Sequence, residues 1–408
     1  MSIALAAQNL ARVFWNRTAK LVRRGRQWTR RRGKDLRETQ KHARAQMKMG
    51  SERGRDAAQQ AYTGAVRTSR YWDRLRRRAW PIVARDVSAR RTLRQVASGS
   101  DPIILGPWLS EVGYEALYWV PFVRWFTRQY DVDPARVVAI SRGGVSAWYG
   151  GIASRYVEQF ELFTPAEFGA RNEARRGESD QKQLGLSAFD EEILARARAR
   201  LGIGTASVCH PSAMFQLMRQ FWLGNDSLQS VLDYTEYEPV NEIAHVALPT
   251  LPDRFVAIKF YTGRALMDTP EHREQLRRLV ERLARRFPIV ALTTNLSVDE
   301  HADYVFRDIP GLMTLDGWLT PQNNLAVQTE VIRRATRFVG TCGSLAWLAP
   351  MLGTDTLALY ADDHFLTPHL YAARHAYNSM QAARFTPMDL AVLDHVDAPE
   401  LASVNRPS

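Results

Sequence analysis

Two glutamates, Glu111 and Glu115, lie about one helical turn apart in the stretch SEVGYEALYWVPFV, residues 110–123. A carboxylate can take the proton of an attacking hydroxyl, and a neighbouring carboxylate can raise its pKa towards the range that a base needs. Both residues are therefore candidate catalytic bases, and Glu115 is the preferred one. The alternative is that both carboxylates only complement the positive start of a helix.

A second stretch, FVGTCGSLAWLAPMLG at 338–353, begins as an apolar strand, passes through very small residues and continues as an apolar helix. Glycine permits close approach to the backbone, and the free N–H groups of a helix start attract phosphate. Thr341, Gly343 and Ser344 are therefore candidate ligands of a diphosphate. Tight packing of the strand against the helix would explain the same residues.

Other polar residues follow predicted strands or open predicted helices. Lys259 and Arg264 flank FYTG after a strand, and Arg264 is the better candidate for a phosphate ligand because it lies in the loop. Three residues that open a helix, Gln322, Asn323 and Asn324, either cap it or hold the ribose or phosphate of a nucleotide. On the acceptor side, Arg142 in SRGG and His210 before Pro211 are the candidates.

The charge of the 408-residue chain is divided unevenly. Residues 1–100 carry 26 Lys/Arg and 6 Asp/Glu, a net of +20, which leaves 29 and 37, a net of −8, for residues 101–408. Apolar residues near helical spacing with flanking arginines indicate an arm that lies on an anionic membrane surface through residues 1–95. A solvated tail, a nucleic-acid arm and an organelle transit peptide are the alternatives, and nucleic acid is disfavoured because no binding motif accompanies the charge.

Cysteine content and hydropathy indicate where the chain works. Cys209 and Cys342 are the only cysteines, which excludes a disulfide framework and fits a reducing compartment. The sequence has no run of 18 apolar residues, so no membrane-spanning helix is expected. We therefore expect a cytoplasmic protein that is peripheral on the inner face of the membrane.

From residue 101 onwards, strands alternate with helices in two sets. This predicts two parallel sheets with helices on both faces, whose ligands bind beyond the carboxyl ends of the strands. The expected organisation is a basic helical arm at 1–98, an acceptor-side α/β domain at 99–240, a linker at 241–253, a donor-binding α/β domain at 254–390 and a tail at 391–408. Within it, residues 166–188 are expected as a surface excursion and 302–308 as a strand.

These features resemble the GT-B class of nucleotide-sugar glycosyltransferases. GPWLSEVGYEALYWVPFVRW is similar to the first strand, loop and helix of the acceptor domain of that class, and VGTCGSLAWLAPMLGTDTLALY to the stretch that receives the donor diphosphate. Glu115 and Pro121 have the spacing seen in heptosyltransferase-like enzymes, whereas Thr341 and Ala346 stand near the places where those enzymes carry an acid and a histidine. The resemblance therefore implies the broad class: two Rossmann-like domains facing a cleft.

The function that this resemblance implies is transfer of a sugar from a nucleotide-sugar donor to a polysaccharide, glycan or lipid-linked acceptor, with no cofactor and no bound metal. Two alternatives stay open: a non-catalytic sugar- or nucleotide-binding protein with a basic tether, and another transferase with an anionic donor. The motifs of ATP hydrolysis, NAD binding and α/β-hydrolases are absent from the sequence. Asp131 and Asp133 are interpreted as a turn, and His364, His369 and His375 as surface or packing residues without a carboxylate at a metal-binding spacing.

Overall fold

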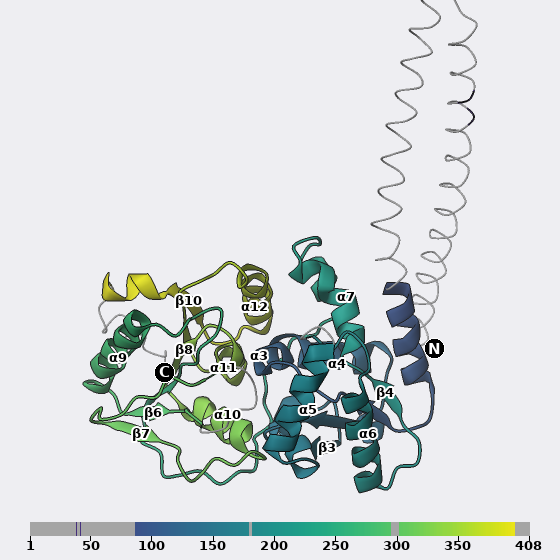
Figure 1. Cartoon of the computed structure of the whole chain (residues 1–408), viewed down its shortest axis with the longest axis horizontal. Coiled ribbons are helices and arrows are strands. Elements are labelled where there is room, and N and C mark those ends of the chain that lie inside the picture. The colour runs from purple at the N-terminus through teal and green to yellow at the C-terminus, as the bar shows by residue number, and fades with distance from the viewer. Residues whose placement is uncertain (1–37, 39–40, 42–85, 179–181, 295–301, 396–408) are drawn as a thin grey trace, which may run out of the picture. The chain divides into compact units, whose positions relative to one another are not determined.

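The computed structural model describes residues 38, 41, 86–178, 182–294 and 302–395 (Figure 1). The chain divides into two compact units, Met1–Val87 and Ser88–Ser408, and the fold below is that of the second. The predicted basic arm and its membrane contact lie almost entirely outside the described residues. The helix at 86–98 buries Ala89, Leu93 and Val96 in the core of the second unit. No helix among the described residues has the length and apolar content needed to cross a bilayer.

The first half of the second unit is built on a four-stranded parallel sheet in the order β3-β2-β1-β4. Its central strands, β1 (Ile103–Leu105) and β2 (Val137–Ser141), are buried along their whole length, as the apolar runs of parallel strands require. The flanking strands are β3 (Arg155–Glu158) and β4 (Ser207–Cys209). The helices of this half are α3 (Val112–Tyr114), α4 (Val120–Gln129), α5 (Pro165–Glu178), α6 (Ala188–Leu201), α7 (Ser212–Trp222) and α8 (Gln229–Leu232).

The second half has a six-stranded parallel sheet in the order β10-β9-β8-β5-β6-β7. Its strands are β5 (Val256–Lys259), β6 (Ile289–Ala291), β7 (Leu312–Thr314), β8 (Arg337–Thr341), β9 (Thr356–Tyr360) and β10 (Phe385–Asp389). Its helices are α9 (Pro270–Ala284), α10 (Asn324–Arg334), α11 (Ser344–Leu348) and α12 (Thr367–Met380). The prediction of two parallel α/β halves is therefore confirmed. The expected strand at 302–308 is wrong, because this segment only forms one isolated bridge, between Tyr261 and Asp303.

The two halves meet at the carboxyl ends of their sheets. The loop after β2 contacts the start of α10, where Ala326 N donates to Gly143 O at 2.9 Å. Trp148 Nε1 donates to Thr329 Oγ1 at 3.1 Å across the same contact. One apolar cluster contains residues of both halves, such as Trp108 and Trp347. The surfaces that the sequence predicts to face a cleft are therefore in direct contact at these points.

Candidate active site at the junction of the two halves

The segment that follows β1 carries both candidate glutamates, and the structure separates them. Glu111 lies just before α3, with its side chain 49% exposed and Oε1 3.6 Å from Lys182 Nζ. A single π-helical turn, Glu115–Trp119, then joins α3 to α4. Such turns are rare and are frequent at functional sites. Glu115, on this turn, is fully buried.

Glu115 is held by two hydroxyl groups of the first half. Its Oε1 accepts hydrogen bonds from Ser141 Oγ at 2.5 Å and from Tyr149 OH at 2.7 Å. Its Oε2 has no hydrogen-bond partner among the described residues. Burial raises the pKa of Glu115 to about 7, and the two hydroxyl donors oppose that rise only in part. Since Glu115 is enclosed by protein, Glu111 is the carboxylate that reaches the surface of the junction.

The pKa of Glu115 leads to a prediction about stability. The folded chain keeps the Glu115 proton up to about pH 7, whereas the unfolded chain loses it near 4.5, so this group makes stability fall as the pH rises between these values. Glu115→Gln should remove that slope, which amounts to about 3 kcal/mol between pH 4.5 and pH 8. Urea unfolding of both proteins across this range measures it, and parallel pH profiles would contradict the assignment.

Tyr114 connects the candidate residues of the two halves. Its hydroxyl lies 3.0 Å from His369 Nε2 on α12, and Lys182 Nζ lies 3.4 Å from the centre of its ring. Burial raises the pKa of Tyr114, the charge of Glu111 adds to the rise, and the charge of Arg264 opposes it. Glu111, Tyr114 and Lys182 are in contact, and the charge of Arg264 acts on Tyr114; we call these four residues the junction cluster.

The loop after β8 contacts protein where the sequence predicts a diphosphate. Thr341 Oγ1 accepts a hydrogen bond from Tyr261 N at 2.9 Å and donates one to Tyr261 O at 3.1 Å. A Cβ on Gly343, whose φ is +129°, would lie 2.4 Å from the hydroxyl oxygen of Tyr261. A Cβ on Gly113 would lie 2.7 Å from Ser344 N. The small residues thus leave room for the Tyr261 side chain and the backbone of α3. The helix that follows them, α11, has only five residues.

The two cations near β5 have different surroundings. Lys259 Nζ lies 2.6 Å from Asp303 Oδ2 and donates to Leu292 O at 3.0 Å, with only 11% of its side chain exposed. Arg264 is exposed in the loop that follows the strand. Lys259 therefore forms an internal ion pair, whereas Arg264, in the loop after β5, faces solvent.

The three polar residues at the start of α10 order the turn that leads into this helix. Gln322 Nε2 donates to Phe160 O at 3.0 Å, which joins the two halves. Asn323 Oδ1 accepts from Thr320 N at 2.7 Å, and Asn324 Nδ2 donates to Pro321 O at 2.8 Å. Among the described residues no side chain caps α10: the expectation that these residues cap the helix is wrong, and their bonds order the preceding turn instead.

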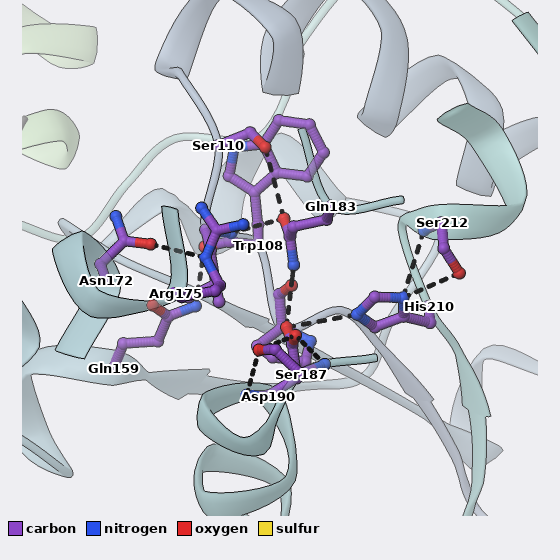
Figure 2. A network of polar contacts seen from close by, with 12 residues as sticks. Trp108, Ser110, Gln159, Asn172, Arg175, Gln183, Ser187, Asp190, His210 and Ser212 are labelled. Carbon is purple, nitrogen blue, oxygen red and sulfur yellow. Dashed lines mark hydrogen bonds and ion pairs between the residues drawn. The ribbon is translucent and has the colours of Figure 1, made fainter. Parts of the chain in front are cut away.

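Arg142 and His210, the acceptor-side candidates, are both buried. The Arg142 guanidinium donates to Ser110 O at 2.9 Å and Trp108 O at 3.4 Å, so it braces the loop that carries Glu111. His210 Nε2 lies 3.2 Å from Asp190 Oδ1, and its Nδ1 accepts from Ser212 N at 3.2 Å (Figure 2). Both ring nitrogens of His210 thus face protein groups.

The segment at 166–188, which was expected to be a surface excursion, contributes to this region. Gln183 is buried, accepts from Leu109 N at 2.9 Å and donates to Pro107 O at 2.9 Å (Figure 2). Its Nε2 also donates to Asp190 Oδ1 at 3.0 Å. Burial raises the pKa of Asp190, but the contacts with His210 and Ser187 outweigh burial and lower it overall. The surface interpretation is therefore wrong for Lys182 and Gln183.

The histidines near the end of the chain differ from one another. His369 is buried, with Nδ1 2.7 Å from Tyr118 OH and Nε2 3.0 Å from Tyr114 OH. His364 is exposed, and its Nδ1 lies 2.7 Å from Asp362 Oδ1. Possible ligand atoms of Asp362, Asp363 and His364 all lie within 4.8 Å of one another. The expectation that no carboxylate stands at a metal-binding spacing from these histidines is therefore wrong for His364.

No protein-family model matches the chain, and no curated protein matches it. Among solved structures, the chain is similar to a glycosyl transferase family 9 protein from Veillonella parvula, with 10% identity, a TM-score of 0.39, and coverage of 75% of this chain and 90% of that one. It is also similar to the iron-containing dodecameric glycosyltransferase TibC from enterotoxigenic E. coli, with 12% identity, a TM-score of 0.33 and coverage of 64% and 58%. A third is MnaA from S. aureus in a structure with UDP, with 12% identity, a TM-score of 0.29 and coverage of 76% and 99%. The TM-scores of these three structures all lie below 0.5.

Proposed function

We propose that the protein is a glycosyltransferase that moves a sugar from a nucleotide-sugar donor to a glycan or lipid-linked acceptor. The observation that supports this is the meeting of the carboxyl ends of two parallel sheets at the junction cluster. Ligands of open α/β sheets bind beyond these ends. Here the first half contributes Glu111, Tyr114 and Lys182, and the second half contributes Arg264.

The reaction assigns distinct roles to the members of the cluster. The Glu111 carboxylate takes the proton of the acceptor hydroxyl, and the oxygen of that hydroxyl forms a bond to the anomeric carbon of the donor sugar. The bond from that carbon to the diphosphate breaks, and the diphosphate departs with the electron pair. Arg264 and Lys182 stabilise the charge that develops on this leaving group.

Buried residues behind the cluster position it. Arg142 and Gln183 hold the loop before Glu111, and Glu115 fixes the end of β2 through Ser141. We also propose that Gly343 and Ser344 donate backbone N–H groups to the diphosphate. Since the backbone of Gly113 lies against Ser344 N, this step requires α3 to move away when the donor binds.

The proposal includes where the acceptor is found. The net charge of +20 over residues 1–100 favours an anionic leaflet, where lipid-linked acceptors are held. In this proposal the basic arm brings the protein to the cytoplasmic face of the membrane, and transfer does not depend on a bound metal ion.

Calorimetric titration of the full chain with UDP, GDP, CDP and CMP tests the proposal. One nucleotide should bind with a micromolar dissociation constant, and Arg264→Ala should weaken binding about tenfold or more, because a charge-assisted hydrogen bond to phosphate is lost. Arg285→Ala is the matched control, since Arg285 is an exposed arginine at the end of α9. Absence of nucleotide binding, or equal binding by Arg264→Ala, would rule out this function at this site.

A further inference from the structure

A cavity of about 600 Å³ lies on the second half, between α12 and the beginning of β10. One wall is a single face of α12, which includes Leu370, Tyr371, Arg374 and Asn378 at helical spacing. Along the helix axis, the lining residues from Thr367 to Asn378 span about 16 Å at the usual rise per residue. The cavity is therefore an elongated groove, which we call the α12–β10 groove.

The groove combines an exposed aromatic ring with positive charge. Tyr371 is 61% exposed although it is a large aromatic side chain, and Arg374 and Arg384 are both exposed. None of the described residues that line the groove is an aspartate or glutamate. Arg384 Nε forms a long ion pair with Asp355 Oδ2 at 4.0 Å, and Arg384 N donates to Asp355 Oδ1 at 2.9 Å. The lining is thus complementary to an acidic ligand that also presents an apolar face.

Two other kinds of occupant fit less well. A plain alkyl chain would leave the donors of Arg374, Asn378 and Arg384 without partners, at a cost of about 1–3 kcal/mol for each donor that became buried. An added β-strand would need N–H groups on the free edge of β10. Arg384 O accepts from Thr356 N of β9, so Pro387, three residues on, falls on the free edge and has no N–H.

A densely charged polymer is also disfavoured. Residues 101–408 carry a net charge of −8, which repels a polyphosphate backbone outside the local field of the two arginines. An acidic sugar chain has fewer charges, its ring faces pack on aromatic side chains, and its hydroxyls pair with amide and guanidinium groups. Carboxylate and phosphate substituents suit arginine in particular.

We propose that the α12–β10 groove binds an acidic saccharide and that the acceptor of the transfer reaction is an acidic glycan. This inference rests on the proposed function, because it names the class of acceptor. The groove lies on α12, the helix that also carries His369, which contacts Tyr114 of the junction cluster. One helix thus contributes both to the junction and to the groove, so a glycan chain held in the groove is retained by the enzyme between transfers.

A glycan array with acidic and neutral glycans, probed with the full chain, tests the inference. Glycans that carry uronic acid, sialic acid or phosphate should be bound in preference to neutral ones. Tyr371→Ala and Arg374→Ala should each weaken binding tenfold or more, while Arg285→Ala should not change it. Because Tyr371 is exposed, its truncation should leave the melting temperature unchanged, which separates loss of binding from loss of fold.

Two results would overturn the inference: no preference for acidic glycans, or undiminished binding by both groove variants. The Arg264→Ala variant distinguishes this inference from the proposed function, because this variant should lose nucleotide binding and still bind the acidic glycans of the array. If the unmodified chain bound acidic glycans on the array but no nucleotide, the proposed transferase function would be contradicted, and the groove would remain as a saccharide-binding site. Nucleotide binding without array binding would contradict the groove alone.

Discussion

Glu111→Gln should lower the rate of sugar transfer at least 100-fold and leave nucleotide affinity within about twofold, because general-base catalysis typically contributes 10²–10⁴ in rate. Glutamine has nearly the same shape but cannot take a proton. Glu111 is the candidate base with an exposed carboxylate, 3.6 Å from Lys182 and next to the aromatic ring that Lys182 covers. The measurement is release of the nucleoside diphosphate in the presence of acceptor, with calorimetry on the same protein samples.

Two controls make this result specific. Glu191→Gln changes an exposed glutamate of α6 in the same half and should keep full activity. Glu115→Gln should affect kcat less than Glu111→Gln, since Glu115 is enclosed by Ser141 and Tyr149. The reverse order would return the role of base to Glu115. A chain that binds nucleotide but transfers sugar to no acceptor would instead be a non-catalytic binding protein.

His369 should make the protein lose stability as the pH falls below about 6.5. Burial, helped by the charge of Lys182, lowers the pKa of His369 to about 3 from its usual 6.5. Between these values the unfolded chain binds a proton that the folded chain does not, so acid favours unfolding. The loss is about 1.4 kcal/mol per pH unit, and about 5 kcal/mol over the whole interval.

His369→Gln should remove this slope, and urea unfolding from pH 7 to pH 4 measures it. The slope due to Glu115 has the opposite sign between pH 4.5 and pH 7, so each profile must be compared with that of the unmodified chain. His375→Gln, on an exposed position of α12, is the matched control and should leave the profile unchanged. A slope that survives in His369→Gln would mean that other groups cause the acid sensitivity.

The strand–helix alternation was predictable because buried parallel strands are apolar along their whole length. Strands β1 and β2 are such runs, and both were expected. The segment at 302–308 instead alternates buried Tyr304 and Phe306 with exposed Val305, and it makes only the isolated bridge between Asp303 and Tyr261. Strand β10 gave no such signal, because Pro387 and its half-exposed neighbours are typical of an edge.

At the candidate site, sequence spacing selected loops that follow strands but did not show which side chains reach the surface. Glu115 and Glu111 look equivalent on an ideal helix, and the π-helical turn that buries Glu115 has no clear signature in the sequence. Lys182 and Gln183 belong to a charged stretch whose composition predicts an exposed surface segment. Their place beside Glu111 and Leu109 depends on tertiary packing that no local pattern encodes. Arg264 stood out in the sequence because it lies in the loop that follows strand β5, and the structure leaves it exposed there.

The contact between Gly113 and Ser344 has a consequence for how this sequence can vary. Position 113 tolerates no side chain while the loop after β8 keeps its course, since a Cβ there would lie 2.7 Å from Ser344 N. Gly343 is constrained in the same way by the hydroxyl of Tyr261. Position 113 should therefore stay glycine in homologous chains, whereas changes at 343 and 261, which are far apart in the sequence, should occur together.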